Sequence, residues 1–168
     1  MNTSTALVSI VIPSHNEGDD VLATVDCILR NSDVPLQLIV VDDSSTDHSA
    51  QKLQQLAAQG LIELARGQQL GAIGARNLGA SMASAAIIGF IDAHCYTPKG
   101  WLQPLLDTFA SRPELDAISP AIGCTRNLQA KGYGATWLDD ELAMHWLPYA
   151  TPLQEVPFIG GAATFIRH

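Results

Sequence analysis

The chain has 168 residues, of which 47% are hydrophobic and 15% are charged. This length and composition fit one compact domain with its own core and exclude a disordered tail. The formal net charge is −8, and the nine Lys and Arg residues are scattered without a basic run. A nucleic-acid partner is therefore not expected, because phosphate backbones are bound mainly by clustered Lys and Arg.

The cellular location is predicted from features that the sequence lacks. The first residues, MNTSTALVSIVIPSHNE, have neither the positive n-region nor the small-residue cleavage site of a signal peptide. No apolar run reaches the roughly 18 residues that a transmembrane helix needs. Cys27, Cys95 and Cys124 are too few and too scattered for a disulfide framework. We therefore expect a cytoplasmic protein with free thiols and no transmembrane segment.

Short apolar runs alternate with helical patterns along the first 125 residues. Strands are expected at ALVSIVIP (6–13), LQLIVVDDSS (36–45), LIELA (61–65), AAIIGFID (85–92) and ELDAISPAI (114–122). Helices are expected at 21–31, from a cap at 45–47 to Gly60, at 68–84, and at 99–112, where Pro104 interrupts the pattern. This alternation predicts an α/β fold with a mostly parallel central sheet and helices on both faces.

The composition changes from about Arg126. The following segment carries aromatic residues and prolines, and its helical periodicity is weak. The stretch FIGGAATFIRH then predicts a turn at Gly160 and Gly161, followed by an apolar run.

Paired aspartates end the second expected strand. Neighbouring residues of a strand point to opposite faces, so we expect one of Asp42 and Asp43 to turn into the scaffold. The other would face the cleft at the carboxyl ends of the strands, where open α/β sheets bind ligands. A carboxylate there can accept an N–H of a nucleobase or a ribose hydroxyl, or it can simply cap a turn.

The stretch GAIGARNLG has no G-x-G-x-x-G spacing, and the chain has no P-loop. Its glycines are interpreted as sites of close helix packing. Arg76 lies among these small residues, where a buried guanidinium needs an anionic partner. A salt bridge to an aspartate at a strand end and a contact with a ligand phosphate or base are equally good interpretations.

Asp92-Ala93-His94 follows the fourth expected strand. Positions i and i+2 at a strand end are expected to place Asp92 and His94 on one face. A carboxylate oxygen and an imidazole nitrogen are acceptable ligands for Mn²⁺, and a metal there would neutralise a leaving diphosphate. The alternative is a purely structural role at the end of a strand. His15, His48 and His145 are interpreted as surface or turn residues, because no G-x-S-x-G elbow accompanies them.

Five stretches in order resemble one known family: VSIVIPSHNE, LIVVDDSSTD, GAIGARNLGA, IIGFIDAHCYTPKGWL and FIGGAATFIR. They are similar to the motifs of family 2-type glycosyltransferases with the GT-A fold. The D-x-H form, followed by Cys95, is similar to polypeptide N-acetylgalactosaminyltransferases. The resemblance extends from about Val8 to Arg167, and it implies one domain over 1–168, with a nucleotide-binding part at 8–125 and the start of an acceptor-side part at 126–168.

The resemblance implies transfer of a sugar from a nucleoside diphosphate, UDP above all, to an acceptor hydroxyl. Asp92 and His94 would hold Mn²⁺ or Mg²⁺ on the donor diphosphate, and Asp43 would bind the base. The implied donor-binding positions are Pro13, Glu17, Asp43, Arg76, Asp92, Ala93, Gly160 and Gly161.

Two departures from the family pattern leave alternatives open. Tyr96 follows Cys95 where the polypeptide-transferase relatives have Glu, and the acceptor-side acidic motif and a further His ligand are expected beyond Gly161. No catalytic base is assigned, and the acceptor is unknown. A non-catalytic nucleotide-sugar binding module is one alternative. A dinucleotide-binding oxidoreductase is disfavoured by the missing G-x-G-x-x-G.

Overall fold

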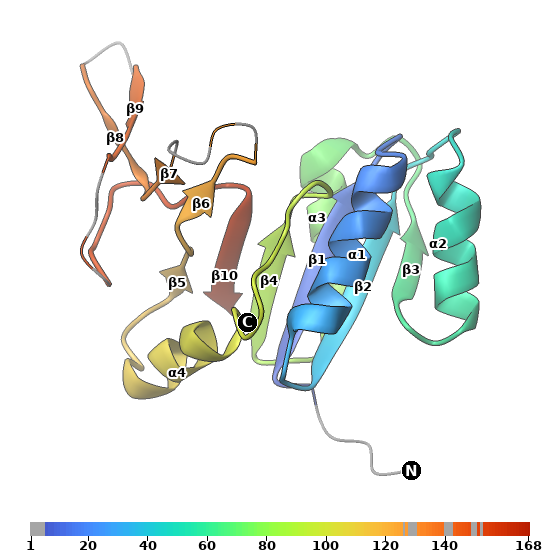
Figure 1. Cartoon of the computed structure of the whole chain (residues 1–168), viewed down its shortest axis with the longest axis horizontal. Helices are drawn as coiled ribbons and strands as arrows, with labels where there is room; N and C mark the ends of the chain where they lie inside the picture. Colours follow the sequence, from blue (N-terminus) through green and yellow to red (C-terminus); the bar gives the residue numbers. More distant parts are fainter. Residues whose placement is uncertain (1–5, 126, 128–130, 140–142, 149–150, 152) are drawn as a thin grey trace.

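The structure, a computed structural model, describes residues 6–125, 127, 131–139, 143–148, 151 and 153–168. Figure 1 shows a sheet with helices packed on it, and a smaller β-rich part to one side. The elements in chain order are β1 Val8–Ser14, α1 Asp19–Asn31, β2 Leu36–Asp42, α2 Ser49–Ala58, β3 Glu63–Arg66, α3 Gly71–Met82, β4 Ile87–Ile91, α4 Gln103–Ser111, β5 Ala117–Ile118, β6 Ile122–Gly123, β7 Lys131–Gly132, β8 Ala135–Trp137, β9 Met144–Trp146 and β10 Ala163–Arg167.

The main sheet has the strand order β3-β2-β1-β4-β10-β5. β1 pairs in parallel with β2 and β4, and β2 pairs in parallel with β3. β10 runs antiparallel to both β4 and β5 and so joins β5 to the rest of the sheet. The expected α/β fold with a mostly parallel sheet is confirmed, and the apolar run after Gly161 forms its antiparallel strand.

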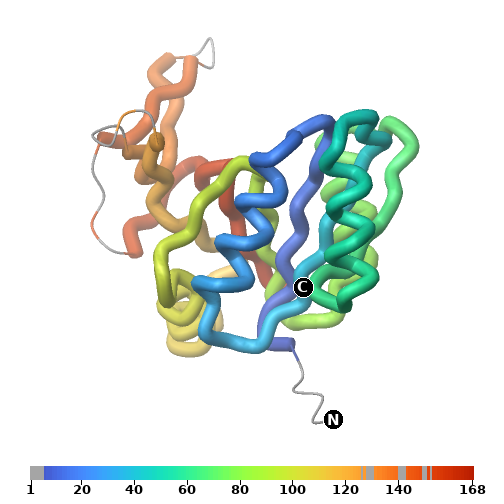
Figure 2. The backbone as a smooth tube through the Cα atoms, turned by 45° about the vertical axis from the view of Figure 1, so that its right-hand side comes forward, coloured from blue at the N-terminus to red at the C-terminus, as the bar shows by residue number. Residues whose placement is uncertain are grey.

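Helices cover both faces of the sheet (Figure 2). Alternate residues of β1 separate the two sides: Ile10 and Ile12 pack with Val25 of α1, whereas Val11 packs with Ala75 of α3. α2 and α4 join the first of these clusters. Because successive side chains of β1 point to opposite faces of the sheet, this one apolar run contributes to two hydrophobic cores.

α3 approaches the sheet closely because Gly79 carries no side chain. A Cβ at this position would collide with the side chains of Val11 on β1 and Val41 on β2. The interpretation of the glycines as packing sites is therefore right for Gly79. It is wrong for Gly71, which has open space where a side chain would lie but adopts a φ of +69° at the start of α3.

Three local expectations are corrected. Pro104 lies in the first turn of α4, where its missing N–H breaks no helical hydrogen bond, so it begins this helix and does not interrupt it. The run 114–122 is not one strand, because β5 spans only two residues before Pro120, which cannot donate to a ladder. The N-cap of α2 is His48, although the backbone N–H of Ser49 donates to the carboxylate of Asp47.

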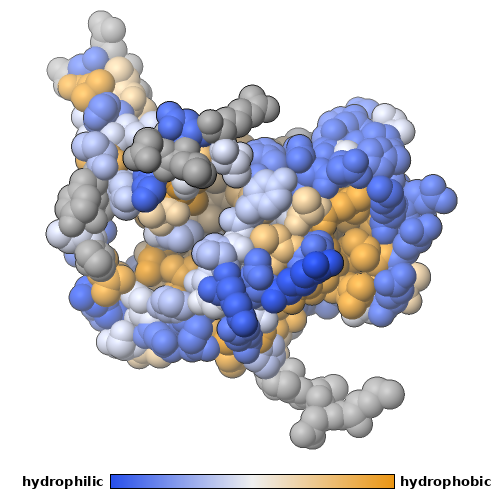
Figure 3. Space-filling model, viewed as in Figure 1, coloured by the Kyte–Doolittle hydropathy of each residue, from blue (hydrophilic) through white to orange (hydrophobic). Residues whose placement is uncertain are grey.

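The part after β5 forms two small antiparallel pairs, β6 with β7 and β8 with β9. The β8–β9 hairpin extends away from the main sheet (Figure 1). Exposed apolar side chains gather on it (Figure 3), among them Leu138 and Met144. No helix in the described part of the chain has the length and apolar character needed to cross a membrane.

Candidate functional site

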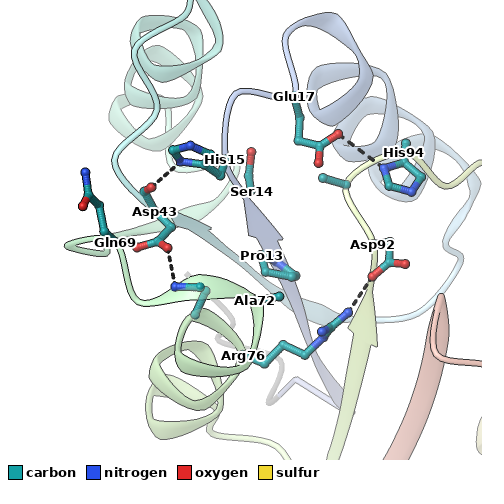
Figure 4. Close-up of a pocket in the computed structure, with 13 residues that line it drawn as sticks. Pro13, Ser14, His15, Glu17, Asp43, Gln69, Ala72, Arg76, Asp92 and His94 are labelled. Atoms are coloured by element: carbon teal, nitrogen blue, oxygen red, sulfur yellow. Dashed lines mark hydrogen bonds and ion pairs between the residues drawn. The ribbon is translucent and has the colours of Figure 1, made fainter.

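A cavity of about 660 Å³ lies at the carboxyl ends of β1, β2 and β4. This is the edge of an open α/β sheet at which ligands bind. Figure 4 shows its side chains. The lining residues are Pro13, Ser14, His15, Glu17, Asp43, Gln69, Gly71, Ala72, Ala75, Arg76, Asp92, Ala93 and His94.

The loop between β1 and α1 (residues 15–18) forms one wall and carries Glu17. Its backbone is held by the next loop along the sheet: the N–H of Asn16 donates to Ser45 Oγ at 2.9 Å, and the N–H of Thr46 donates to Asn16 Oδ1 at 2.8 Å. Asn16 adopts a positive φ of 55°, a conformation that Asn tolerates better than most residues. Glu17 is therefore presented by a loop whose backbone is fixed on both sides.

The two aspartates at the end of β2 point in different directions, as strand alternation predicts. Asp42 is fully buried, accepts the N–H of Ser45 at 3.0 Å and lies 3.4 Å from the guanidinium of Arg66. Asp43 lines the cavity. Asp42 therefore belongs to the scaffold, and Asp43 is the residue available to a ligand.

Asp43 also organises the start of α3. Its two carboxylate oxygens accept the backbone N–H groups of Leu70 and Gly71, both at 2.8 Å. The positive φ of Gly71 allows this approach. On the other side, His15 Nδ1 lies 2.6 Å from the carbonyl oxygen of Asp43. Asp43 thus joins three segments at one end of the cavity.

The Asp92-Ala93-His94 segment is a turn, because β4 ends at Ile91. The expectation that strand geometry would place Asp92 and His94 on one face is therefore wrong, although both line the cavity. Buried Thr24 of α1 holds this turn: its hydroxyl donates to the carbonyl of Ala93 and accepts the N–H of Cys95, each at 3.0 Å.

The two predicted metal ligands interact with opposite walls of the cavity (Figure 4). Asp92 Oδ1 accepts from the guanidinium of Arg76 on α3 at 2.6 Å. His94 Nδ1 lies 3.3 Å from Glu17 Oε2 on the opposite side. The structure thus forms the first of the two interactions that the sequence left open for Arg76, a salt bridge to a strand-end aspartate.

The charges of the lining residues indicate what the cavity needs in order to bind an anion. Three carboxylates, on Glu17, Asp43 and Asp92, face one guanidinium, that of Arg76, among the described lining residues. These carboxylates would therefore repel a diphosphate bound in the cavity unless a cation accompanied it.

The donor set of the wall fits such a cation in part. Carboxylate and imidazole are acceptable ligands for Mn²⁺, and Mg²⁺ is often held by one or two carboxylates together with substrate phosphates. The described residues contain no group of three His, Cys, Asp or Glu side chains arranged around one point. Asp92 and His94 therefore fit a site that ligand oxygens would complete.

Cys95 lies beside this turn and is partly buried. Burial raises the pKa of its thiol to about 11, and the nearby negative charge of Asp92 adds to the shift. The thiol therefore stays protonated at neutral pH, and its Sγ lies 3.5 Å from the carbonyl oxygen of Ala162. Cys27, Cys95 and Cys124 all have free thiols in the structure.

Gly160 and Gly161 do not line this cavity. Gly160 borders a second cavity of about 550 Å³ between β5 and residues 153–159. The Gly-Gly turn nevertheless meets the Asp92 turn, because the carbonyl of Ala162 accepts the N–H of Asp92 at 3.0 Å. The structure thus places the two glycines beside the predicted site, outside the cavity wall.

Some residues that line the cavity or hold its wall in place do not stand out in the sequence. His15, interpreted above as a surface or turn residue, lies in the wall next to Asp43. Gln69, which has a positive φ of 58°, and Thr24, whose hydroxyl holds the Asp92 turn, are not among the sequence-based candidates. The sequence signal that could have identified Thr24 is its position as a polar residue on the apolar face of the expected helix.

The comparison with protein-family models matches the description "Glycosyl transferase family 2" over residues 9–159. The chain belongs to glycosyl transferase family 2. The resemblance inferred from the five ordered motifs is thereby confirmed.

Curated relatives of this family 2 chain are named as glycosyltransferases. It is 40% identical over 120 residues to polypeptide N-acetylgalactosaminyltransferase 6 of Mus musculus, a match that covers 68% of this chain and 19% of the relative. It is 34% identical over 192 residues to putative polypeptide N-acetylgalactosaminyltransferase 13 of Drosophila melanogaster, covering 96% of this chain and 34% of the relative. The chain thus spans between a fifth and a third of these relatives.

Solved structures support the GT-A fold of this family 2 chain. S. aureus TarS 1-349 in complex with UDP aligns with a TM-score of 0.61 and 20% identity, over 71% of this chain and 37% of that one. The mannosyltransferase PcManGT from Pyrobaculum calidifontis, in complex with GDP-Man and Mn²⁺, aligns with a TM-score of 0.60 and 23% identity, over 75% and 38%. At these identities the likeness concerns the fold alone.

Proposed function

We propose that the cavity binds a nucleoside-diphosphate sugar, with UDP as the nucleotide, as the donor of a glycosyl transfer to an acceptor hydroxyl. The observation that carries this proposal is the meeting of four separate family motifs in one cavity: Glu17, Asp43, Arg76 and the turn 92–94 all line it. The names of the relatives and the UDP-bound structural neighbour support the donor class.

Each side chain has a role suited to its position. Asp43 keeps unused lone pairs on oxygens that already accept two N–H groups, so it can also accept the N–H of a base. Pro13 and Ala93 add apolar surface to the lining of the cavity. Arg76 would turn from Asp92 to the diphosphate oxygens when the negative charge of Asp92 is otherwise compensated.

Asp92 and His94 would hold Mn²⁺ or Mg²⁺ together with donor oxygens. Such a cation would supply Lewis-acid neutralisation of the diphosphate leaving group. The charge of the wall and the Mn²⁺ in the complex of the structural neighbour PcManGT support its presence. No base for the acceptor proton is assigned among the described residues.

We further propose that residues 8–125 form the donor-binding part and that 126–168 begin the acceptor side of a single domain. The contact between Ala162 and the Asp92 turn supports this division, because it places the Gly160-Gly161 turn next to the donor cavity. The cytoplasmic location expected from the sequence stays a prediction.

Thermal unfolding with nucleotides and metal tests the proposed function. UDP with Mn²⁺ should raise Tm by about 5–10 °C when UDP is about 100-fold above its Kd. Without Mn²⁺ the shift should fall by at least about half, because the acidic wall then repels the diphosphate. Asp92→Asn should lose the metal-dependent part, and His145→Ala, on the distant β9 strand, should keep it.

GDP in place of UDP tests the choice of base. A larger shift with GDP would overturn the assignment of UDP while leaving the donor class intact. A melting curve unchanged by UDP and by GDP in the presence of Mn²⁺ would contradict the proposal as a whole. Metal-dependent binding of UDP-sugars without transfer of the sugar to any acceptor and without release of UDP would instead identify a binding module.

A further inference from the structure

We propose that Glu17 is a positioning residue that selects the tautomer of His94, and this inference rests on the proposed metal-dependent donor site. Glu17 Oε2 lies 3.3 Å from His94 Nδ1. An ionised carboxylate only accepts hydrogen bonds, so the pair requires a proton on Nδ1. In neutral imidazole the unprotonated nitrogen is then Nε2, and that atom is the one able to bind a cation.

The contact is built from two fixed backbones, which distinguishes it from a chance pairing of surface side chains. On one side, the loop that carries Glu17 is held by the N–H of Gly18, which donates to Asp47 Oδ2 at 2.8 Å. The N–H of Asp20 also donates to the carbonyl of Glu17 at 3.0 Å, at the start of α1. Glu17 therefore leaves a backbone whose position does not depend on His94.

On the other side, the His94 turn is fixed by the α1 helix. Thr24 binds the carbonyl of Ala93 and the N–H of Cys95, the two peptide groups next to the His94 backbone. The side chain of His94 is 58% exposed, so packing alone does not set the orientation of its ring. A hydrogen-bond partner on the ring is then what orients it.

The pairing follows the chemistry of metal-binding histidines. Such a histidine commonly donates its second ring N–H to a carboxylate, which fixes both the tautomer and the orientation of the ring. Here Asp92, the other predicted ligand, is held by Arg76 on the opposite wall, so Glu17 is the carboxylate that reaches the imidazole. Glu17 thus acts on the metal site indirectly, by orienting the ring of His94. This role is additional to its position in the lining of the cavity.

The tautomer can be measured in the metal-free full chain by ¹⁵N NMR of the histidine rings at about pH 8, above the ordinary pKa of imidazole. In the unmodified protein, His94 should carry its proton on Nδ1. In Glu17→Ala the proton should move to Nε2, and Glu17→Gln, whose carbonyl still accepts, should restore part of the Nδ1 form. Asp20→Asn, which removes one charge from the exposed first turn of α1, should leave the tautomer unchanged.

Mn²⁺ binding is measured on the same proteins by electron paramagnetic resonance titration, with Mn²⁺ alone and with UDP present. Glu17→Ala should weaken Mn²⁺ affinity about 10–100-fold, and Asp20→Asn should not. An Nε2 proton in the unmodified protein, or the same tautomer in Glu17→Ala, would overturn the inference. A tautomer that changes in Glu17→Ala while the Mn²⁺ affinity stays the same would also overturn the inference. Absence of Mn²⁺ binding in the unmodified chain would instead count against the proposed function, because the NMR result is obtained without metal.

Discussion

Asp47 lies outside the cavity, yet its carboxylate joins the two loops that form one wall. Oδ2 accepts the N–H of Gly18 in the β1–α1 loop, and Oδ1 accepts the N–H and the hydroxyl of Ser49 at the start of α2. These hydrogen bonds, above all that of the Ser49 hydroxyl, lower the pKa of Asp47 below its ordinary value of 3.8.

This lowered pKa predicts loss of stability in acid. A carboxyl whose pKa is lower in the folded state stabilises the fold above its unfolded pKa, and the contribution is lost as the pH falls through the folded pKa. Asp47→Asn should therefore lower the free energy of unfolding in urea at neutral pH, and the difference from the unmodified protein should shrink below about pH 4. A difference that stays constant into acid, or an equal effect of Asp20→Asn, would contradict this account.

The contact of α3 with the sheet depends on one missing side chain. Gly79 faces Val11 and Val41 at distances that leave no room for a Cβ. α3 also carries Arg76, about one turn before Gly79, so the depth of this packing affects where the guanidinium lies relative to Asp92.

Gly79→Ala should destabilise the protein even though alanine favours helix by about 0.5–1 kcal/mol. The added methyl forces α3 away from β1 and β2, and overpacking of this kind costs about 1–3 kcal/mol. The free energy of unfolding measured in urea checks the prediction. Asn77→Ala, at an exposed position of the same helix, should be neutral or stabilising, and a stabilised Gly79→Ala would refute the packing argument.

The sequence was sufficient for the order of the strands and helices from β1 to α4, because apolar alternation and helical spacing are local signals, but it failed at 114–122, where one strand was expected and β5 spans two residues. Seven of the cavity's residues were expected: Asp43, Asp92 and His94 because the ends of parallel strands meet at one edge of a sheet, Arg76 because a guanidinium among small residues needs an anion, and Pro13, Glu17 and Ala93 from the resemblance to family 2 glycosyltransferases. The sequence could not give the pairing of Arg76 with Asp92 or of Glu17 with His94. These contacts depend on side-chain directions across the cleft, between segments that no sequence periodicity connects.

The order of the sheet was also beyond the sequence. β10 lies between β4 and β5, and each of its neighbours precedes it by a long stretch of chain. Phe165 makes this insertion possible: it is fully buried, its ring covers Gly89 of β4, and it meets Trp101 edge to face with ring centroids 5.8 Å apart.

Phe165→Ala should therefore loosen the whole β4–β10–β5 side of the molecule. Removal of a fully buried phenylalanine costs about 3–5 kcal/mol, and the free energy of unfolding in urea measures it. Leu61→Ala, at a position that is 45% exposed, should change this value by less than about 0.5 kcal/mol. Equal losses in the two variants would show that β10 contributes no more than surface packing.

The insertion of β10 has a consequence for the order of folding. β1 pairs with β2, and β2 with β3, across single helical connections, so these pairings close short loops and are entropically cheap, whereas β4 must pass β3 and β2 to pair with β1. β5 has no sheet neighbour among the described residues except β10, and it must wait until that later segment arrives. We therefore expect β1, β2 and β3 to assemble first, and the cavity to be completed only in slower steps, when β4 docks on β1 and the edge of the sheet closes around Phe165.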